Sequence, residues 1–301
     1  MPERTQLLRL TEGDIEILTH TFHCRRLSID HLIALTGRTA QPLKVRLSKL
    51  RAHGCLACKE RPFQRYLYAL GKNSVSVLAE EGVGSVETVR RRVRSRLNER
   101  SELYIPHDLM VTDIHVILQR LPKERGITLR AWEEGKPIFC RVRIKTRNKW
   151  KQYDLKPDAF CELKDGRYPD GPKTIHYFIE ADRSTTKDET FQNKLRGYRA
   201  YYKSEAHKNK FGHKGFRVLT VTKTEARARS LCEAAREVIP EHESVMYLFT
   251  HLTRDFLQDP SHIFGKIFMS PQSLKEVVRK NGRKEIVDTG LRHTLIPPVK
   301  P

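Results

Sequence analysis

The chain has 301 residues, of which 57 are Lys or Arg and 36 are Asp or Glu, and its formal net charge is +21. It exceeds the roughly 100 to 150 residues of a typical domain, so we expect two domains with separate cores. No run approaches the about 18 apolar residues of a membrane span and no apolar signal core follows the first residues, which excludes a membrane protein and predicts a soluble, cytoplasmic one.

The charge makes nucleic acid the first partner to consider, because basic side chains gain affinity for phosphate backbones by releasing condensed counterions. The six cysteines are spread along the chain, which favours reduced thiols over a disulfide framework. Cys55 and Cys58, with His53 and Cys24 nearby in sequence, form at most half a zinc site, since a second pair at zinc-finger spacing is missing. We therefore do not expect zinc.

The sequence of residues 1–84 predicts three short helices followed by a hairpin. Thr11 and Ser28 can cap the first two helices, and Gly37 makes the turn before the third. The third helix starts at Thr39 and stops before Gly54. Its apolar residues recur at i, i+4 and i+7 on one face, and these are Leu43, Leu47 and Leu50.

Two short strands, residues 55–59 and 64–70, complete this first domain. Helix, helix, tight turn, basic helix and hairpin is the order of a winged helix-turn-helix domain, which inserts its third helix into the major groove and lays the wing on phosphates. Such domains also serve as protein-interaction or dimerisation modules, but the basic composition favours double-stranded DNA. The predicted DNA contacts are Lys44, Arg46 and Lys49 on the third helix, and Arg61 and Arg65 on the hairpin.

A basic linker, residues 85–103, follows a composition break at residues 80–85. It contains Arg90, Arg91 and Arg94. As a helix this segment would lay a basic ridge along phosphates, whereas as a solvated linker it would bind nothing specific. We favour the phosphate contact, which would raise affinity for any DNA sequence in a salt-sensitive way.

Residues 104–250 alternate between helical and strand periodicity, which predicts an α/β domain with a mixed sheet. The predicted helices span residues 110–121, 188–203 and 224–238, and the predicted strands span residues 127–132, 139–144, 154–163, 175–182, 216–222 and 245–250. Residues 251–301 remain unassigned, because short apolar clusters there alternate with Pro, Gly and Asp.

Strict alternation places Asp158, Glu180 and Asp182 on one face of this sheet. Lys194 lies beside the apolar stripe of the following helix, which can lean back over the sheet. Three carboxylates on one face repel one another, so a metal ion or basic neighbours must accompany them. Two purely structural interpretations also apply: Asp182 pairs with Arg183, or Lys194 covers the apolar stripe with its aliphatic stem.

These residues resemble two known groups of proteins. Pro157-Asp158, Glu180-Ala181-Asp182 and a lysine on the next helix look like the PD-(D/E)XK nuclease superfamily, whose core is αβββαβ. A wider set resembles the replication-relaxation family of plasmids and mobile elements, which also has an N-terminal winged helix. That set consists of His107-Asp108-Leu109 with Val111 and Asp113, Pro157-Asp158-Ala159, residues 178–185, Lys194-Leu195 with Tyr198, and residues 217–222. The resemblance covers roughly residues 10 to 250.

The resemblance implies a metal-dependent site for phosphodiester hydrolysis. Asp158 and Glu180 would hold Mg²⁺ or Mn²⁺, Asp182 would assist, and Lys194 would act on water or phosphate. His107 and Asp113 are candidate accessory residues from the first helix of this domain. The chain departs from the superfamily pattern at Asp182, where a lysine is expected two residues after the glutamate, and Lys194 would replace that lysine from the helix.

We therefore expect an α/β protein in which an N-terminal winged helix-turn-helix (1–84) and a basic linker (85–103) precede a PD-(D/E)XK-like αβββαβ domain (104–250). Its expected function is that of a DNA-binding protein of a bacterial mobile element or plasmid, with a metal-dependent endonuclease or nickase domain. The alternative is a non-catalytic accessory factor for replication, transfer or transposition that keeps the nuclease fold as a scaffold. Further expected partners are other mobile-element proteins and a second copy of the chain, since winged-helix proteins often bind two half-sites.

Overall fold

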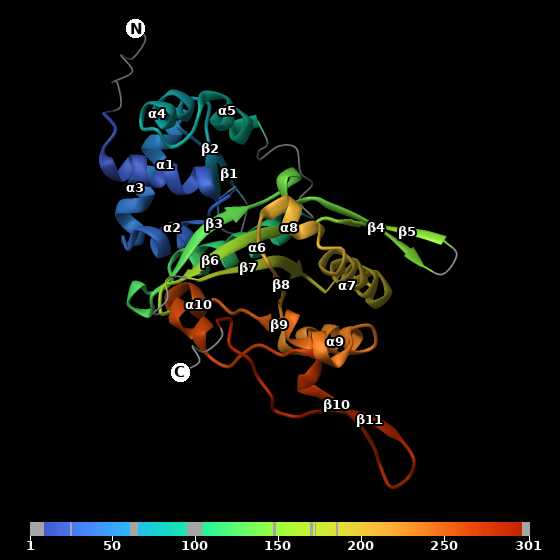
Figure 1. Ribbon diagram of the computed structural model, residues 1–301. Helices are drawn as coiled ribbons and strands as arrows, with labels where there is room; N and C mark the ends of the chain where they lie inside the picture. Colours follow the sequence, from blue (N-terminus) through green and yellow to red (C-terminus); the bar gives the residue numbers. More distant parts are fainter. Residues whose placement is uncertain are drawn as a thin grey trace. The chain divides into compact units, whose positions relative to one another are not determined.

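The computed structural model describes residues 9–24, 26–60, 66–94, 104–146, 149–168, 171, 173–184 and 186–296. The chain divides into two compact units, Met1–Val116 and Ile117–Pro301, whose helices and strands are drawn in Figure 1. Among the described residues, no helix has the length and apolar character needed to cross a lipid bilayer.

The first unit opens with three helices and a two-stranded antiparallel hairpin. These elements are α1 (Glu12–His23), α2 (Ile29–Thr36), α3 (Ala40–Ala52), β1 (Leu56–Lys59) and β2 (Leu67–Leu70). Thr11, Ser28 and Thr39 are the N-cap residues of the three helices, as the sequence predicts. Gly37 ends α2 with a φ of 68°, a conformation that glycine adopts without strain. The predicted apolar face of α3 is confirmed, because its three leucines are at most 1% exposed.

Three more helices follow the hairpin: α4 (Ser74–Glu80), α5 (Val86–Arg94) and α6 (Ile105–Gln119). The sequence left the basic linker, residues 85–103, as either a helix or a solvated segment, and in its described part the structure shows the helix α5. Val89 is the residue of α5 that lies fully buried. The division between the two units falls inside α6.

A five-stranded mixed sheet forms the centre of the second unit. Its strands are β3 (Ile127–Glu133), β6 (Ala159–Asp165), β7 (Lys173–Asp182), β8 (Arg217–Thr222) and β9 (Tyr247–His251), in the order β3-β6-β7-β8-β9. The pairs β3/β6 and β6/β7 are antiparallel, whereas β7, β8 and β9 run parallel. The structure thus confirms a mixed α/β architecture.

Two helices, α7 (Asp188–Lys203) and α9 (Glu225–Arg236), cover one face of this sheet, with the short α8 (Ala206–Phe211) between them in sequence. Phe178 of β7 and Phe249 of β9 pack in one core with Leu195 of α7 and Leu231 of α9. Figure 1 shows α9 beside β8 and β9. Because of this packing, α7 lies over the face of β7 that carries Phe178.

The prediction of one continuous strand over residues 154–163 is wrong. The segment breaks after Leu155, where β5 (Lys149–Leu155) ends, and β6 begins at Ala159. β5 pairs with β4 (Cys140–Thr146) in a hairpin outside the main sheet. Pro157 lies in the break, and because proline has no N–H it cannot donate to a central ladder.

The described part of residues 251–301, which the sequence left unassigned, contains several further elements. These are α10 (Asp255–Gln258), 3-10 turns at Pro260–Phe264 and Pro271–Ser273, β10 (Leu274–Val278) and β11 (Lys284–Asp288). Met269 pairs with Phe249 of β9 through two backbone hydrogen bonds of 2.8 Å. This segment therefore packs along the β9 edge of the sheet, and β10 and β11 form a separate hairpin.

Candidate functional site

Glu180 and Asp182 lie at the carboxyl end of β7. Asp158 is the residue just before β6, the strand that neighbours β7. Asp158 N donates to Ile179 O at 3.0 Å, and Ala181 N donates to Asp158 Oδ2 at 2.8 Å. Ala159 pairs with Ile179 in the ladder, so one step further the register sets Asp158 opposite Glu180. The structure thus brings these two predicted carboxylates together.

Glu180 is only 4% exposed, and both of its carboxylate oxygens have a partner on α7. Lys194 Nζ donates to Oε2 at 2.5 Å, and the Tyr198 hydroxyl donates to Oε1 at 2.5 Å. Residues four apart share one face of a helix, so a single turn of α7 supplies both donors. Lys194 therefore does more than cover the apolar stripe, because it forms an ion pair with Glu180.

Burial and charge act against each other at this pair. Burial raises the pKa of Glu180, although the ammonium of Lys194 works in the opposite direction. Burial alone would lower the pKa of Lys194, but the negative charges of Glu180, Asp158 and Asp182 raise it above its ordinary value. Lys194 is therefore a firmly protonated cation among three carboxylates.

Asp182 is buried beside this pair but has a different cation. Arg227 of α9 donates from Nε to Asp182 Oδ1 at 3.0 Å, and Ser184 N donates to the same oxygen at 2.7 Å. Burial would raise the pKa of Asp182, but the hydrogen bonds from Arg227, Ser184 and Thr186 and the charge of Arg227 together lower it. The expected strand-end pairing with Arg183 is wrong, since Arg227 is the arginine that Asp182 binds.

Arg227 and Tyr198 contact the predicted carboxylates, and the sequence assigned a role to neither of them. The i, i+4 spacing of Lys194 and Tyr198 offers a usable signal, because it puts a hydroxyl on the same helix face as the predicted lysine. Arg227 comes from α9, 45 residues after Asp182. Nothing in the local sequence indicates that pairing.

The donor set of the site consists of carboxylate oxygens, which Mg²⁺ and Mn²⁺ prefer as hard ligands. In the part of the chain that the structure describes, no group of three or more His, Cys, Asp or Glu side chains is arranged to hold a metal ion. Asp158 and Glu180 supply two carboxylates, a number that Mg²⁺ commonly takes from a protein while it retains several waters.

The predicted DNA-contact residues of the first unit divide into three groups. Lys44 and Lys49 are exposed on α3, and three arginines are exposed on α5, namely Arg90, Arg91 and Arg94. Arg46 is different, because it hydrogen-bonds to the fully buried carboxylate of Asp14 and thereby serves the fold. Arg61 and Arg65 lie outside the described residues.

The two candidate accessory residues lie on α6. Asp113 Oδ1 is 2.6 Å from His31 Nε2 of α2, so its carboxylate is engaged within the first unit. His107 is half-buried on the same helix. The nearby Asp108 accepts a hydrogen bond of 2.6 Å from Arg26. These polar contacts therefore tie α6 to α2 and to the segment between α1 and α2.

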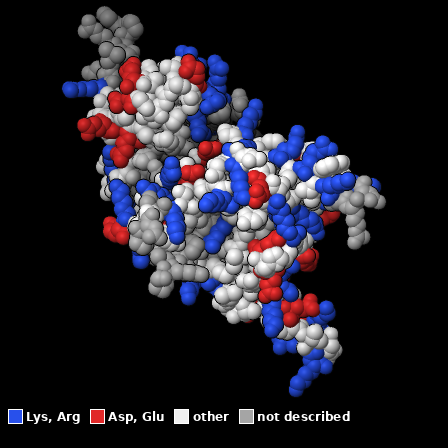
Figure 2. All heavy atoms as spheres, viewed as in Figure 1, with Lys and Arg blue, Asp and Glu red and all other residues white. Residues whose placement is uncertain are grey.

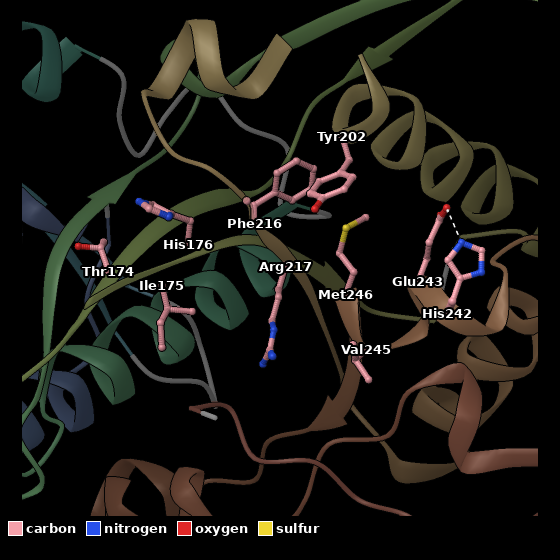
Figure 3. A pocket seen from close by; sticks show the side chains of 11 residues that line it. Thr174, Ile175, His176, Tyr202, Phe216, Arg217, His242, Glu243, Val245 and Met246 are labelled. Carbon is pink, nitrogen blue, oxygen red and sulfur yellow. Dashed lines mark ion pairs between the residues drawn. The ribbon is translucent and has the colours of Figure 1, made fainter. Parts of the chain in front are cut away.

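A pocket of about 580 Å³ opens at the other end of the parallel strands. His176 and Arg217 lie near the starts of β7 and β8, so they are at the opposite end of these strands from Glu180. Figure 3 shows the Tyr202 and Phe216 rings beside each other in the pocket wall, with their centroids 5.7 Å apart. The pocket is therefore separate from the carboxylate site.

Comparison with known proteins places the chain by its sequence. The family model described as Replication-relaxation matches residues 19–218. No curated protein and no solved structure matches the chain. The match runs from Thr19 in α1 to Val218 at the start of β8, and it includes Asp158, Glu180, Asp182 and Lys194.

Proposed function

Because the chain belongs to the replication-relaxation family, we propose that it is a double-stranded DNA-binding protein that acts in the replication of a bacterial plasmid or other mobile element. Its first unit would bind the duplex as a winged helix. Exposed Lys44 and Lys49 on α3 would lie at the major groove, and the arginines of α5 would contact phosphates. The net charge of +21 supports a polyanionic partner.

The second unit would cut the DNA, as a metal-dependent endonuclease or nickase with a PD-(D/E)XK-like fold. The observation that carries this proposal is the contact of 2.5 Å between Lys194 Nζ and Glu180 Oε2, with Asp158 opposite Glu180 across the strand pair. Asp158 and Glu180 would hold Mg²⁺ or Mn²⁺. That ion would neutralise charge on the phosphate and lower the pKa of a water molecule.

The protein's own side chains would do the remaining work. Lys194 would stabilise the negative charge that develops on the phosphate, since its raised pKa keeps it charged at neutral pH. The Tyr198 hydroxyl would fix the orientation of Glu180 through its hydrogen bond to Oε1. Asp182, bound to Arg227, would keep the end of β7 in place and leave Lys194 as the cation nearest Glu180.

A second candidate function is that of a non-catalytic accessory factor. The observation that favours it is that each carboxylate oxygen of Glu180 already accepts a hydrogen bond, one from Lys194 and one from Tyr198. In this case the ion pair would replace a metal ion as the charge partner of the carboxylate. The chain would then recognise an origin, a transfer region or a transposon end without cutting it.

Conversion of supercoiled plasmid in Mg²⁺ or Mn²⁺ tests the two candidates. If the chain is a nuclease, the native protein should give nicked or linear DNA, and Glu180→Gln and Lys194→Met should each be about 100-fold slower or worse. Lys208→Met, at an exposed lysine of α8, should cut like the native protein and is the matched control.

Folding must be checked in these variants, because Lys194→Met leaves a buried carboxylate without its cation. The double variant Glu180→Gln with Lys194→Met removes both charges together and should unfold near the native temperature. If the native protein binds duplex DNA but produces no nicked or linear plasmid with either metal, the nuclease proposal is wrong and the accessory role stands. Mn²⁺ binding that is equal in native protein and Asp158→Asn would also contradict the metal site.

A further inference from the structure

The hairpin of β10 and β11 is firmly anchored at its base. Leu274 is buried in the core that includes α9, and Ile286 packs against the same core. Arg229 of α9 donates to Ile286 O at 3.1 Å, and Arg292 pairs with Asp288 at 2.7 Å. Figure 1 shows the hairpin extending beyond α9, away from the sheet of the second unit. The base of the hairpin is therefore held against the second unit, and the rest of the hairpin extends from it as an arm.

The tip of the hairpin has a defined turn. Arg279 N donates to Arg283 O at 2.9 Å, and Gly282 N donates to Arg279 O at 2.8 Å. Gly282 has a φ of 76°, which the turn needs and which other residues adopt only with strain. The side chain of Asn281 accepts from Arg283 N at 3.0 Å. These hydrogen bonds thus define the backbone of the turn.

The tip carries a concentration of positive charge. Its basic residues are Arg279, Lys280, Arg283 and Lys284. Arg279 pairs with Glu285 and Lys284 with Glu276 across the strands, so these two cations stabilise the hairpin. Lys280 and Arg283 are exposed and pair with no acidic side chain in the described part of the chain. Figure 2 shows blue side chains at the free end of the hairpin, with red ones nearer its base.

We propose that β10–β11 is a DNA-binding arm, in which Lys280 and Arg283 contact phosphates of the duplex. A two-stranded ribbon fits the major groove, which is about 12 Å wide. Double-stranded DNA fits this surface better than a protein partner, because the only large apolar side chain exposed on the arm is Val278, at 65%. The proposal rests on the DNA-binding part of the proposed function and is independent of hydrolysis.

The first test removes the two unpaired cations. In metal-free buffer, Lys280→Ala with Arg283→Ala should weaken duplex binding, and the slope of log K against log salt should fall by about 2, since each lost phosphate contact removes about 0.9. The matched control is Lys136→Ala with Lys164→Ala, two exposed lysines elsewhere in the second unit. An equal change of slope in both double variants would mean that only net charge matters and would overturn the proposal.

A second test locates the arm on the DNA directly. A photoreactive benzophenone side chain in place of Asn281 should crosslink to duplex DNA, whereas the same group at Glu133, exposed at the end of β3, serves as the reference position. Failure of the Asn281 position to crosslink above the Glu133 reference, while the protein binds duplex, would overturn the arm alone. A native protein without any duplex binding would overturn both the arm and the DNA-binding part of the proposed function, and a loss of plasmid cutting alone would affect neither test.

Discussion

Arg46 donates to Asp14 from its guanidinium, with Nε 2.7 Å from Oδ1. Asp14 has no exposed surface, and it also accepts hydrogen bonds of 2.8 Å from the backbone N–H and the hydroxyl of Thr11, the N-cap of α1. Burial would raise the pKa of Asp14, but the hydrogen bonds from Arg46 and Thr11 lower it. One carboxylate thus caps α1 and joins it to α3.

Arg46→Ala should therefore destabilise the first unit without acting mainly on DNA. Removing the arginine leaves a buried carboxylate with only its capping hydrogen bonds, and we expect the free energy of unfolding to fall by about 2 to 3 kcal/mol. Urea unfolding followed by circular dichroism measures this loss.

The contrast with its neighbours on α3 makes the prediction specific. Lys44→Ala with Lys49→Ala should leave stability within about 0.5 kcal/mol of the native value, because both side chains are exposed. The same double variant should weaken binding of a preferred DNA site. If Arg46→Ala instead keeps native stability and loses DNA affinity, the assignment of Arg46 to the fold is wrong.

At the carboxylate site, some features could be predicted from the sequence and others could not. The period of two in β7 is enough to put Glu180 on the same face as Phe178, because a strand alternates its side chains whatever lies around it. The sequence places Lys194 on the helix that can lean over this face, but it does not identify Glu180 as the partner of that lysine. The sequence could not predict the partner of Asp182, because Arg227 lies on α9 and only the tertiary packing brings it to Asp182.

At the scale of elements, α7 approaches the β4–β5 hairpin closely at Gly197. A Cβ atom at this position would lie 2.8 Å from Leu155 Cδ2 and 3.2 Å from Tyr153 Cβ, both on β5. The second contact is with the root of a side chain, which cannot move aside as the end of a leucine can. Gly197 therefore allows the hairpin to pack against the helix that carries Lys194 and Tyr198.

Gly197→Val should separate these two elements. Overpacking of this kind costs about 1 to 3 kcal/mol, which exceeds the roughly 0.5 to 1 kcal/mol that a helix gains when a glycine is replaced. We expect a net loss of about 1 to 2 kcal/mol by urea unfolding. Thr190→Val, at an exposed position of the same helix, is the control and should change little. A stabilised Gly197→Val protein would show that the hairpin is free to shift.

The hairpin also shows why the element boundaries were hard to predict. Residues 154–163 alternate as one strand would. Within this segment the chain leaves the β4–β5 hairpin and joins the main sheet, and the periodicity does not reveal that change. Pro157 is the local signal for the break, because a proline in the middle of a strand pattern argues against a central strand. The second hairpin, β10–β11, carries a comparable signal in Asn281-Gly282, which is a strong turn sequence between two strands.

At the scale of the whole molecule, the basic side chains have two roles: some pair with buried carboxylates, and others are exposed. Acidic residues are fewer than basic ones by 21, and many of the buried carboxylates are bound to arginine or lysine, as in Asp14, Asp182 and Glu180. Exposed cations therefore remain on α3, on α5 and at the tip of β10–β11. The same carboxylates, together with buried histidines, also determine how the protein responds to acid.

Each unit buries a histidine that resists protonation. In the first unit, burial and then the charge of His23 lower the pKa of His115 to about 3. In the second unit, burial and then the charge of His176 lower the pKa of His213 to about 4. A histidine with a lowered pKa contributes stability above its unfolded value of about 6.5, and this contribution is lost as the pH falls toward the folded pKa.

Both units should therefore lose stability between about pH 6.5 and pH 4, before carboxylates such as Asp14 and Asp182 begin to titrate below their ordinary value of 3.8. From about pH 7.5 to pH 5 we expect each buried histidine to contribute a loss of about 2 kcal/mol, because one pH unit below 6.5 is worth about 1.4 kcal/mol. Urea unfolding at the two pH values measures the loss. His115→Gln should make the first unit less sensitive to pH. If stability is flat down to pH 4.5, these histidines are accessible to protons in the folded state and their burial does not control the acid response.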